Sequence, residues 1–280
     1  MARVFRIICV VATLGSGSEA VIADTGTPRL PLCDITQVRS QPVESYEVGL
    51  RSAFCKTAKS KTCDVRWSNG EGFLRRAVAD TRISDVSTIS YMFGTIVAET
   101  EDRNFSPAAT EVIDRSNENR DYVKDGFYGR GWIQLTYRDK YALASKVLNK
   151  DLVKHPELAL EPDNAYEILY RGMTDGWIEV YRTSSEGAVA REVPVKLGDF
   201  VTSQGVNYEL ARAVINANCK KVDKKCSPPD VEVKPGLYLP PPTSLDVSAK
   251  AAAAATAMEK LLCGSVHAQL APATVSSLVK

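Results

Sequence analysis

The clearest periodic pattern in the chain lies at residues 84–99. Apolar side chains recur there every three or four positions, which places them on one face of a helix. Ser84 or Asp85 can cap its start, because a side-chain oxygen at that position accepts a hydrogen bond from a free backbone N–H. The pattern predicts a buried helix ending near Glu99, with these residues on its apolar face: Val86, Ile89, Met92, Phe93, Ile96 and Val97.

Weaker patterns predict further helices and little β-structure. The expected ranges are 138–148, 162–180 with a proline in the first turn, 207–217, and the alanine-rich 249–262. Between 43 and 79, short apolar clusters alternate with charged residues and a turn-like Ser68-Asn69-Gly70, so no element is predicted there. Six prolines between 228 and 242 favour an extended segment before the last helix. The chain is therefore predicted to be mainly α-helical.

The first residues are typical of a secretory signal peptide. Two arginines precede an apolar run at residues 7–14, and small residues follow it. The run is shorter than the roughly 20 residues that cross a bilayer, and no other segment approaches that length, so no stable membrane insertion is expected. We expect residues 1–23 to be removed near Ala20 or Ala23 and the protein to be secreted or periplasmic. A retained N-terminal anchor is the alternative.

Composition excludes several classes of protein. The 280 residues are 44% hydrophobic and 25% charged, which argues against disorder throughout. Without residues 1–23 the numbers of basic and acidic residues are equal, so no net charge favours a nucleic-acid partner. The two histidines, His155 and His267, lie near no Ser, Cys or carboxylate cluster, which argues against a Ser-His-Asp hydrolase or a multi-histidine zinc enzyme. No metal and no organic cofactor are predicted.

The cysteine count agrees with export. Six cysteines remain after residue 23, and an even number in an oxidising compartment favours disulfides. A zinc site is the competing interpretation, but no CxxC pair occurs. Two pairs are suggested by proximity and the third by the remainder: Cys55 with Cys63, Cys219 with Cys226, and Cys33 with Cys263.

Carboxylates cluster at the end of the predicted buried helix. Glu99 lies on the rim of the apolar face, where desolvation and the negative end of the helix both favour its protonated form. A general acid working near neutral pH needs that form. The alternative is a solvated helix end with three acids. From periodicity alone, Glu101 is almost as good a candidate for the general acid as Glu99.

A second motif resembles a known family. Residues 128–136, which read YGRGWIQLT and continue to Tyr141, resemble the GRGxxQLT…Y signature of glycoside hydrolase family 19. That family comprises chitinases and phage or bacterial endolysins with a lysozyme-like fold. Similar segments lie at 98–100, where Ala-Glu-Thr is similar to the family's His-Glu-Thr, and at 105–107. Others lie at 155–160, 171–177 and 211–216, so the resemblance covers about residues 80–220.

The resemblance implies a fold and a domain organisation. The expected fold is mainly α, bilobal and lysozyme-like, with a substrate cleft and disulfide staples. Residues 24–45 are expected to form an extended lead-in and residues 46–226 the catalytic domain. Residues 227–280 are expected to form a Pro-rich segment and a C-terminal helix or tail, without an identified function. The predicted oligomeric state is a monomer.

The resemblance also assigns roles to individual residues. Glu99 matches the general acid, Glu111 is the best match for the general base, and Thr136 matches the hydroxyl that positions the attacking water. Tyr137 is a further candidate for an aromatic face under a sugar ring. The implied substrate-binding residues are Tyr128, Arg130, Trp132, Gln134, Tyr141 and Asn216.

Each of these roles has a structural alternative. Arg130 and Gln134 can satisfy buried polar groups, Trp132 can belong to the core, and Glu111 can be a surface acid. Two departures from the family bear on the substrate. Ala98 replaces a histidine and Lys140 an asparagine, and both positions contact substrate in the family.

The sequence therefore predicts a secreted glycoside hydrolase, either a chitinase or a lysozyme-like muramidase. It would cleave β-1,4 bonds in a polysaccharide that contains N-acetylglucosamine, chitin or peptidoglycan, by an inverting acid/base mechanism. Such an activity belongs to cell wall degradation or carbohydrate metabolism. The alternatives are a catalytically silent glycan-binding protein of the same fold and a lytic transglycosylase.

Overall fold

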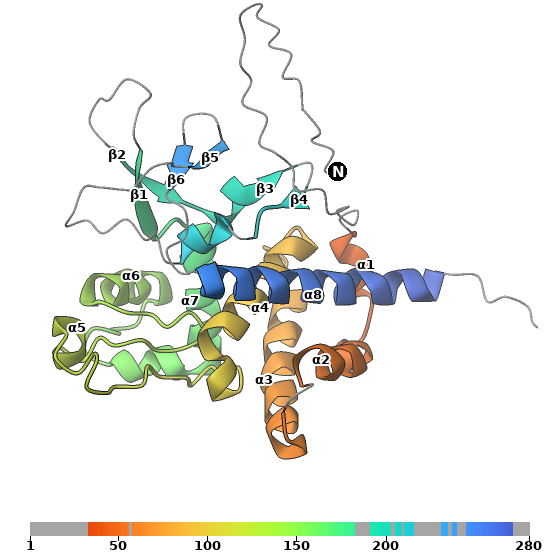
Figure 1. The fold of residues 1–280 in the computed structure, drawn as a ribbon, viewed down its shortest axis with the longest axis horizontal. Helices are drawn as coiled ribbons and strands as arrows, with labels where there is room; N and C mark the ends of the chain where they lie inside the picture. Colours follow the sequence, from red (N-terminus) through yellow and green to blue (C-terminus); the bar gives the residue numbers. More distant parts are fainter. Residues whose placement is uncertain are drawn as a thin grey trace, which may run out of the picture.

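The computed structural model describes most of the chain after residue 32. The described residues are 33–55, 58–182, 191–202, 205–208, 210–215, 231–234, 237–239 and 245–270. Within them the protein is mainly helical, as predicted, with helices below and short strands above in Figure 1. The predicted signal peptide, Asn216 and the predicted pair Cys219 and Cys226 lie outside the described residues.

Helix α4 (Val86–Thr100) is the predicted buried helix. Asp85 caps it, since its side chain accepts a hydrogen bond of 2.7 Å from the backbone N–H of Thr88. Nearly all of α4 is buried, and its apolar face lies in the larger of two hydrophobic clusters. The smaller cluster lies around α6 (Arg138–Leu148), α7 (Pro162–Thr174) and the 3-10 helix η3 (Pro156–Leu160). Ile133 packs against both clusters.

Helix α3 (Ser60–Ala79) was not predicted. The turn-like Ser68-Asn69-Gly70 lies in its middle, and a Cβ on Gly70 would be 3.6 Å from the ring of Phe93. The buried residues Phe73, Leu74 and Ala77 anchor α3 in the core. Their burial outweighs the poor helix propensity of the preceding triplet. Before α3 come the 3-10 helix η1 (Val43–Tyr46) and α2 (Glu47–Phe54).

The lead-in expected to be extended over 24–45 contains a helix, α1 (Ile35–Arg39), and the start of η1. Asp34 caps α1 by accepting from the backbone N–H of Thr36 at 2.8 Å. The Arg39 guanidinium then donates to three backbone carbonyl groups at and beyond the end of α3, those of Val78, Asp80 and Ile83. These contacts dock α1 onto the body of the protein.

The remaining predicted helices are confirmed in part. Helix α6 has the predicted bounds, whereas α7 ends at Thr174 and the chain continues into a hairpin of β1 (Ile178–Arg182) and β2 (Arg191–Val195). Gly176 makes this change of direction with φ +76°, which favours glycine. The helix expected at 207–217 is a 3-10 helix, η5 (Leu210–Val214).

The other described elements are short. Two more antiparallel hairpins join β3 (Val201–Thr202) to β4 (Gly205–Val206) and β5 (Val231–Lys234) to β6 (Leu237–Leu239). The second lies in the Pro-rich segment expected to be extended. The remaining helical turns are η2 (Glu101–Arg103), α5 (Asp121–Lys124) and η4 (Leu197–Phe200).

Helix α8 (Leu245–Leu270) extends the predicted 249–262 at both ends and crosses the front of the molecule in Figure 1. It packs closely along α4, because a Cβ on Gly94 would lie 2.9 Å from the Cβ of Ala255. Two predicted disulfides are confirmed, Cys33–Cys263 and Cys55–Cys63. The first fastens α8 to the start of α1. Among the described helices, none combines the length and the apolar character that a membrane span needs.

Candidate active site

Glu99 lies in the last turn of α4 and is largely buried. Its carboxylate forms an ion pair with Arg212 of η5, and the two side chains are 17% and 8% exposed. Sequence analysis did not single out Arg212, because nothing in the sequence brings η5 next to the end of α4. The buried guanidinium places a positive charge directly beside this carboxylate.

Glu111 is held by the loop that carries the second motif. Its backbone N–H donates to the Gly129 carbonyl at 2.7 Å, and the Gly129 N–H donates to its Oε2 at 3.0 Å. Its Oε1 accepts from Asn117 Nδ2 at 3.0 Å and from the Tyr122 hydroxyl at 2.9 Å. Burial and the hydrogen bond to Glu111 raise the pKa of Tyr122. Glu111 is therefore an anchored hydrogen-bond acceptor, unlike a freely solvated surface acid.

Arg103 connects the segments that carry the two acids. Its guanidinium donates to the backbone carbonyl of Glu99 at 2.5 Å and to that of Thr110 at 2.6 Å. The end of α4 and the residue before Glu111 thus lie within the span of one side chain. Sequence analysis missed this residue, because its two partners lie in segments that the sequence does not show to be close together.

A side chain is excluded at each glycine of the GRG motif for a different steric reason. A Cβ on Gly129 would lie 3.0 Å from Gln134 Oε1 and 3.3 Å from Glu111 Cβ, so a side chain there would push Glu111 away. Gly131 has φ +73°, and a Cβ on it would lie 3.0 Å from the Ala159 carbonyl oxygen. Isolated bridges pair Arg130 with Thr110 and with Leu135. The motif therefore specifies a tight loop, and Glu111 from the preceding segment packs against this loop at Gly129.

Arg130 and Tyr141 brace this loop from within. The buried Arg130 donates to the Gly126 carbonyl and to the Tyr141 hydroxyl, both at 2.8 Å, and stacks 3.7 Å from the ring centroid of Tyr128. The Tyr141 hydroxyl donates to the Tyr128 carbonyl, and burial raises the pKa of Tyr141 to about 12. Arg130 and Tyr141 were expected to bind substrate. Both side chains are buried and their polar groups are used within the protein, as in the structural alternative given for Arg130, and their contact with substrate stays a prediction.

Trp132 is enclosed in the same way. Its side chain is 1% exposed, its Nε1 donates to the Phe105 carbonyl at 2.8 Å, and its ring meets Phe73 edge to face. A ring enclosed in this way has no free face for a sugar. Trp132 is a core residue, the alternative interpretation of the sequence.

Gln134 and Thr136 are half-buried at the loop surface. The Gln134 amide donates to the Gly131 carbonyl at 2.9 Å and to the Ala109 carbonyl at 3.3 Å. The Thr136 hydroxyl donates to the Gln134 carbonyl at 2.7 Å, so its oxygen can still accept a hydrogen bond. Gln134 has a left-handed backbone at φ +52°, which is uncommon outside glycine and belongs to the tight loop.

Exposed apolar side chains lie beside Glu111. Tyr137 is 54% exposed and meets Tyr122, the hydroxyl donor to Glu111, at 5.1 Å between ring centroids. Val112 and Ile113, which directly follow Glu111, are 62% and 45% exposed. Tyr128 is half-buried under Arg130. The exposed aromatic ring beside this carboxylate network is therefore Tyr137, whereas Trp132 is enclosed.

No protein-family model matches this chain, and comparisons with curated proteins and with solved structures also find no match. The resemblance therefore depends on the motif residues themselves.

The two departures from the family have different surroundings. Lys140 donates from Nζ to the Trp177 carbonyl at 2.5 Å and lies 3.7 Å from the Asp139 carboxylate. It thus ties the start of α6 to the segment after α7. Ala98 is half-buried next to Glu99. Among the described residues, no group of three or more His, Cys, Asp or Glu side chains could hold a metal ion.

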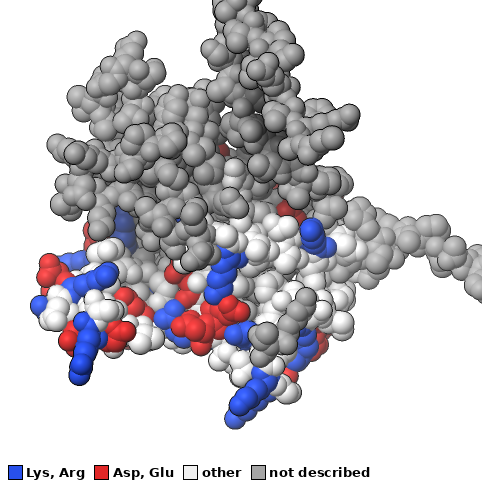
Figure 2. Space-filling view, in the orientation of Figure 1, with Lys and Arg blue, Asp and Glu red and all other residues white. Residues whose placement is uncertain are grey.

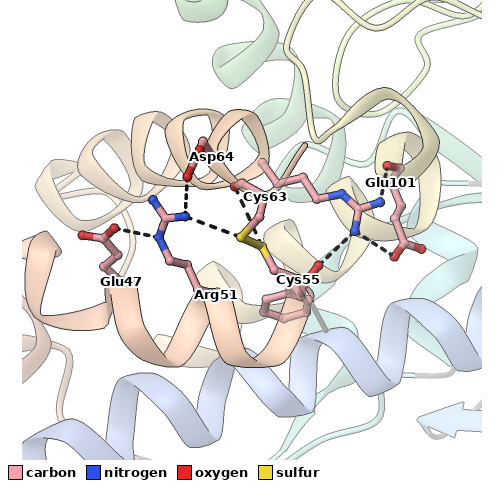
Figure 3. The surroundings of a disulfide bond; sticks show 8 residues. Glu47, Arg51, Cys55, Cys63, Asp64 and Glu101 are labelled. Atoms are coloured by element: carbon pink, nitrogen blue, oxygen red, sulfur yellow. Dashed lines mark hydrogen bonds and ion pairs between the residues drawn. A yellow bond between two sulfur atoms is a disulfide. The ribbon is translucent and has the colours of Figure 1, made fainter. Parts of the chain in front are cut away.

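The end of α4 is also supported from the disulfide side. Arg66 donates to the Phe54 carbonyl at 2.9 Å and to the Glu101 carbonyl at 3.1 Å. Cys55 directly follows Phe54, and Figure 3 shows its disulfide to Cys63 lying between Arg51 and Glu101. Glu101 also pairs with Lys250 of α8 at 2.7 Å. In Figure 2 acidic and basic side chains are gathered together on this face.

Proposed function

We propose that this protein is a glycoside hydrolase that cleaves β-1,4 bonds in a polysaccharide containing N-acetylglucosamine. One observation carries the proposal: the loop that resembles the family 19 signature holds the Glu111 carboxylate through the Gly129 N–H. Arg103 ties the residue before Glu111 to the helix end that carries Glu99. The motif and both acids thus belong to one connected structure.

In the proposed mechanism the acids act on opposite faces of the sugar. Glu99 gives its proton to the glycosidic oxygen as the bond from that oxygen to the anomeric carbon breaks. Glu111 takes a proton from a water molecule as that water attacks the anomeric carbon from the other side. Inversion needs the carboxyl groups roughly 6.5–9.5 Å apart, so that the water fits between base and sugar. Thr136, whose oxygen can still accept a hydrogen bond, would orient that water.

The proposed fold is bilobal and lysozyme-like, with the substrate cleft at this loop. Its support is the division of the buried residues into two hydrophobic clusters, with Ile133 of the loop packed against both. Tyr137 would place its exposed ring against a sugar, and Val112 and Ile113 would extend that apolar surface. Gln134 would contact the substrate at the loop surface.

The proposed location is outside the cytoplasm, in the medium or the periplasm. The two disulfides support it, because such bonds persist in oxidising compartments. The residue pattern before Ala23 agrees with it as well.

The test follows the release of reducing ends from chitin oligosaccharides and from purified peptidoglycan, side by side. We expect the mature protein to cleave one of the two polymers and Glu99→Gln to abolish cleavage. Glu101→Gln is the matched control, because Glu101 is the next acid along the chain and the alternative candidate. Unchanged activity in Glu99→Gln, or loss in Glu101→Gln alone, would contradict the assignment.

A catalytically silent glycan-binding protein of the same fold is the second candidate. It is favoured by Lys140, which stands at a substrate-contact position of the family and is engaged with the Trp177 carbonyl. This candidate predicts saturable binding to the polymer by the folded, oxidised protein, without new reducing ends.

A further inference from the structure

Helix α4 carries a polar stripe in the interior of the protein. Four polar residues recur at a spacing of four, which places them on one helix face: Ser87, Tyr91, Thr95 and Glu99. Tyr91 and Thr95 are completely buried. Buried polar groups cost free energy unless they are hydrogen-bonded, so each member of the stripe needs a partner.

The first part of the stripe has protein partners. The Ser87 hydroxyl donates to one oxygen of Glu259 in α8 at 3.1 Å, and the Tyr208 hydroxyl donates to the other at 2.8 Å. The ring of Tyr208 stacks on that of Tyr91 with 5.7 Å between centroids. This end is a closed hydrogen-bonded arrangement between α4, α8 and the segment before η5.

The part of the stripe that leads to Glu99 is different. Two buried atoms of charged groups there, Glu99 Oε1 and Arg212 Nη1, have no hydrogen-bond partner among the described residues, and the hydroxyls of Tyr91 and Thr95 have no partner there beyond each other. Glu99 Oε1 meets Arg212 through Nη2, as an ion pair without a directed hydrogen bond.

These four groups share one environment. Burial raises the pKa of Tyr91 far above its usual range, the charge of Arg212 and a hydrogen bond with Thr95 oppose that rise, and the charge of Glu99 adds to it. Each of the other three therefore lies close enough to Tyr91 to affect its ionisation.

The mixture of donors and acceptors selects the ligand. A guanidinium N–H can only donate, a carboxylate can only accept, and the two hydroxyls can do either. A cation would be repelled by Arg212 and an anion by Glu99, whereas water fits both. Buried water usually makes two to four hydrogen bonds to groups of this kind. We propose that water is bound between α4 and η5, hydrogen-bonded to Tyr91, Thr95, Glu99 and Arg212.

Bound water would make Tyr91 and Thr95 positioning residues for Glu99. It would complete the hydrogen bonds of the carboxylate on the side away from the substrate and so hold its orientation. The role of Glu99 as an acid rests on the proposed function, whereas the bound water does not. An experiment that finds no bound water can therefore be distinguished from one that finds no glycosidase activity.

The first test replaces the Thr95 hydroxyl by a methyl group of similar shape in Thr95→Val. The variant loses the hydrogen bond between Thr95 and Tyr91 as well as the bond to water, so we expect Tm to fall by about 2–4 °C. A constant or raised Tm would overturn the proposal, and direct detection of the water distinguishes the two losses.

Thr100→Val is the matched control in the same helix. Thr100 is also completely buried, but its hydroxyl donates to the Ile96 carbonyl at 2.7 Å, so its replacement reports the effect of this exchange without bound water. Nuclear Overhauser contacts between water and the Tyr91 ring should be seen in the wild type and in Thr100→Val and be lost in Thr95→Val. Their absence from the wild type would contradict the proposal.

The positioning role is tested by measuring kcat and KM on the polymer that the protein cleaves. We expect Thr95→Val to lower kcat with KM unchanged, Thr95→Ser to restore kcat, and Thr100→Val to leave both unchanged. Equal kcat in Thr95→Val and the wild type would remove the positioning role.

Discussion

Burial divides the aromatic residues around Glu111 into two groups. Trp132 and Tyr141 are enclosed and use their polar atoms inside the protein, whereas Tyr137 exposes half of its ring beside the Tyr122 that holds Glu111. The motif identified the loop but not this division, because burial depends on neighbours distant in the sequence, such as Phe73 against Trp132. Arg103 and Arg212 escaped sequence analysis for the same reason, since their partners lie in other elements.

This division predicts that one aromatic substitution changes substrate binding and another changes stability. Tyr137→Ala should raise KM for the cleaved polymer several-fold and leave Tm unchanged, because an exposed ring that stacks on sugar contributes to binding and little to the core. Trp132→Phe should lower the free energy of unfolding by about 1–3 kcal/mol, since it removes a buried hydrogen bond and some packing. Thermal unfolding and steady-state kinetics check both. A changed KM in Trp132→Phe with unchanged stability would restore its predicted sugar contact.

At the scale of elements, helices with one clear apolar face were predictable and those with mixed patterns were not. The bounds of α6 and the cap of α4 follow from local sequence. Helix α3 was missed because Ser68-Asn69-Gly70 favours a turn locally, while burial of Phe73 and Leu74 stabilises the helix. The shortening of α7 has a local cause in Gly176, and the close contact of α4 with α8 follows from Gly94.

The contact between α4 and α8 predicts that two glycine substitutions change the free energy of unfolding in opposite directions. Gly94→Ala should destabilise the protein by about 1–3 kcal/mol, because the added methyl group meets the backbone of Ala251 and the side chain of Ala255. Gly72→Ala in α3 is the control, since its Cβ would contact only Arg76 Nη1 at 3.7 Å. That variant should gain about 0.5–1 kcal/mol from helix propensity. Urea unfolding measures both, and a stabilised Gly94→Ala would refute the close packing.

The connection between α3 and α4 predicts a pH-dependent contribution to stability. Hydrogen bonds from Arg82 hold the pKa of the Asp80 carboxyl below its usual value against the effect of burial, and Tyr166 donates to the same group. A lowered folded-state pKa stabilises the protein above the pKa of the unfolded chain, and that stability is lost as pH falls through the folded value. Asp80→Asn should therefore cost about 1 kcal/mol at pH 7 and less at pH 3.

Asp163→Asn is the control for this measurement, because Asp163 pairs with Arg76 but is 89% exposed, so its loss should matter little at either pH. Unfolding by urea at the two pH values compares the variants. A cost of Asp80→Asn that is equal at both pH values would contradict the assigned cause.

At the scale of the whole molecule, the C-terminal helix is part of the core rather than a tail. Ala255, Met258 and Leu262 are buried in the larger cluster, and Cys263 is bound to Cys33. The sequence indicated the disulfide but not the position of the helix, because an alanine-rich segment with few large apolar residues does not specify which helix it contacts. Its close approach to α4 becomes possible only opposite Gly94.

The two disulfides should differ in their effect on stability. Cys33–Cys263 closes a loop of sequence separation 230 and Cys55–Cys63 one of 8. If each disulfide acts by restricting the unfolded chain, removal of Cys33–Cys263 should lower the free energy of unfolding by about 5 kcal/mol. Removal of Cys55–Cys63 should lower it by about 2–3 kcal/mol. Double serine variants compared by urea unfolding test this order. A peptide map without reducing agent must first show both links, and a map that lacks Cys33–Cys263 would contradict the fold described for α8.

If Glu99 and Glu111 act as an inverting pair, as we propose, the anomeric form of the first product will show it. Proton NMR would follow the protein with soluble chitin oligosaccharides and with soluble peptidoglycan strands from the first minutes of reaction. We expect cleavage of a β-1,4 bond to yield the α-anomer first, with the β-anomer appearing later by mutarotation. An initial β-anomer, a 1,6-anhydro product, or no product from either substrate would contradict it.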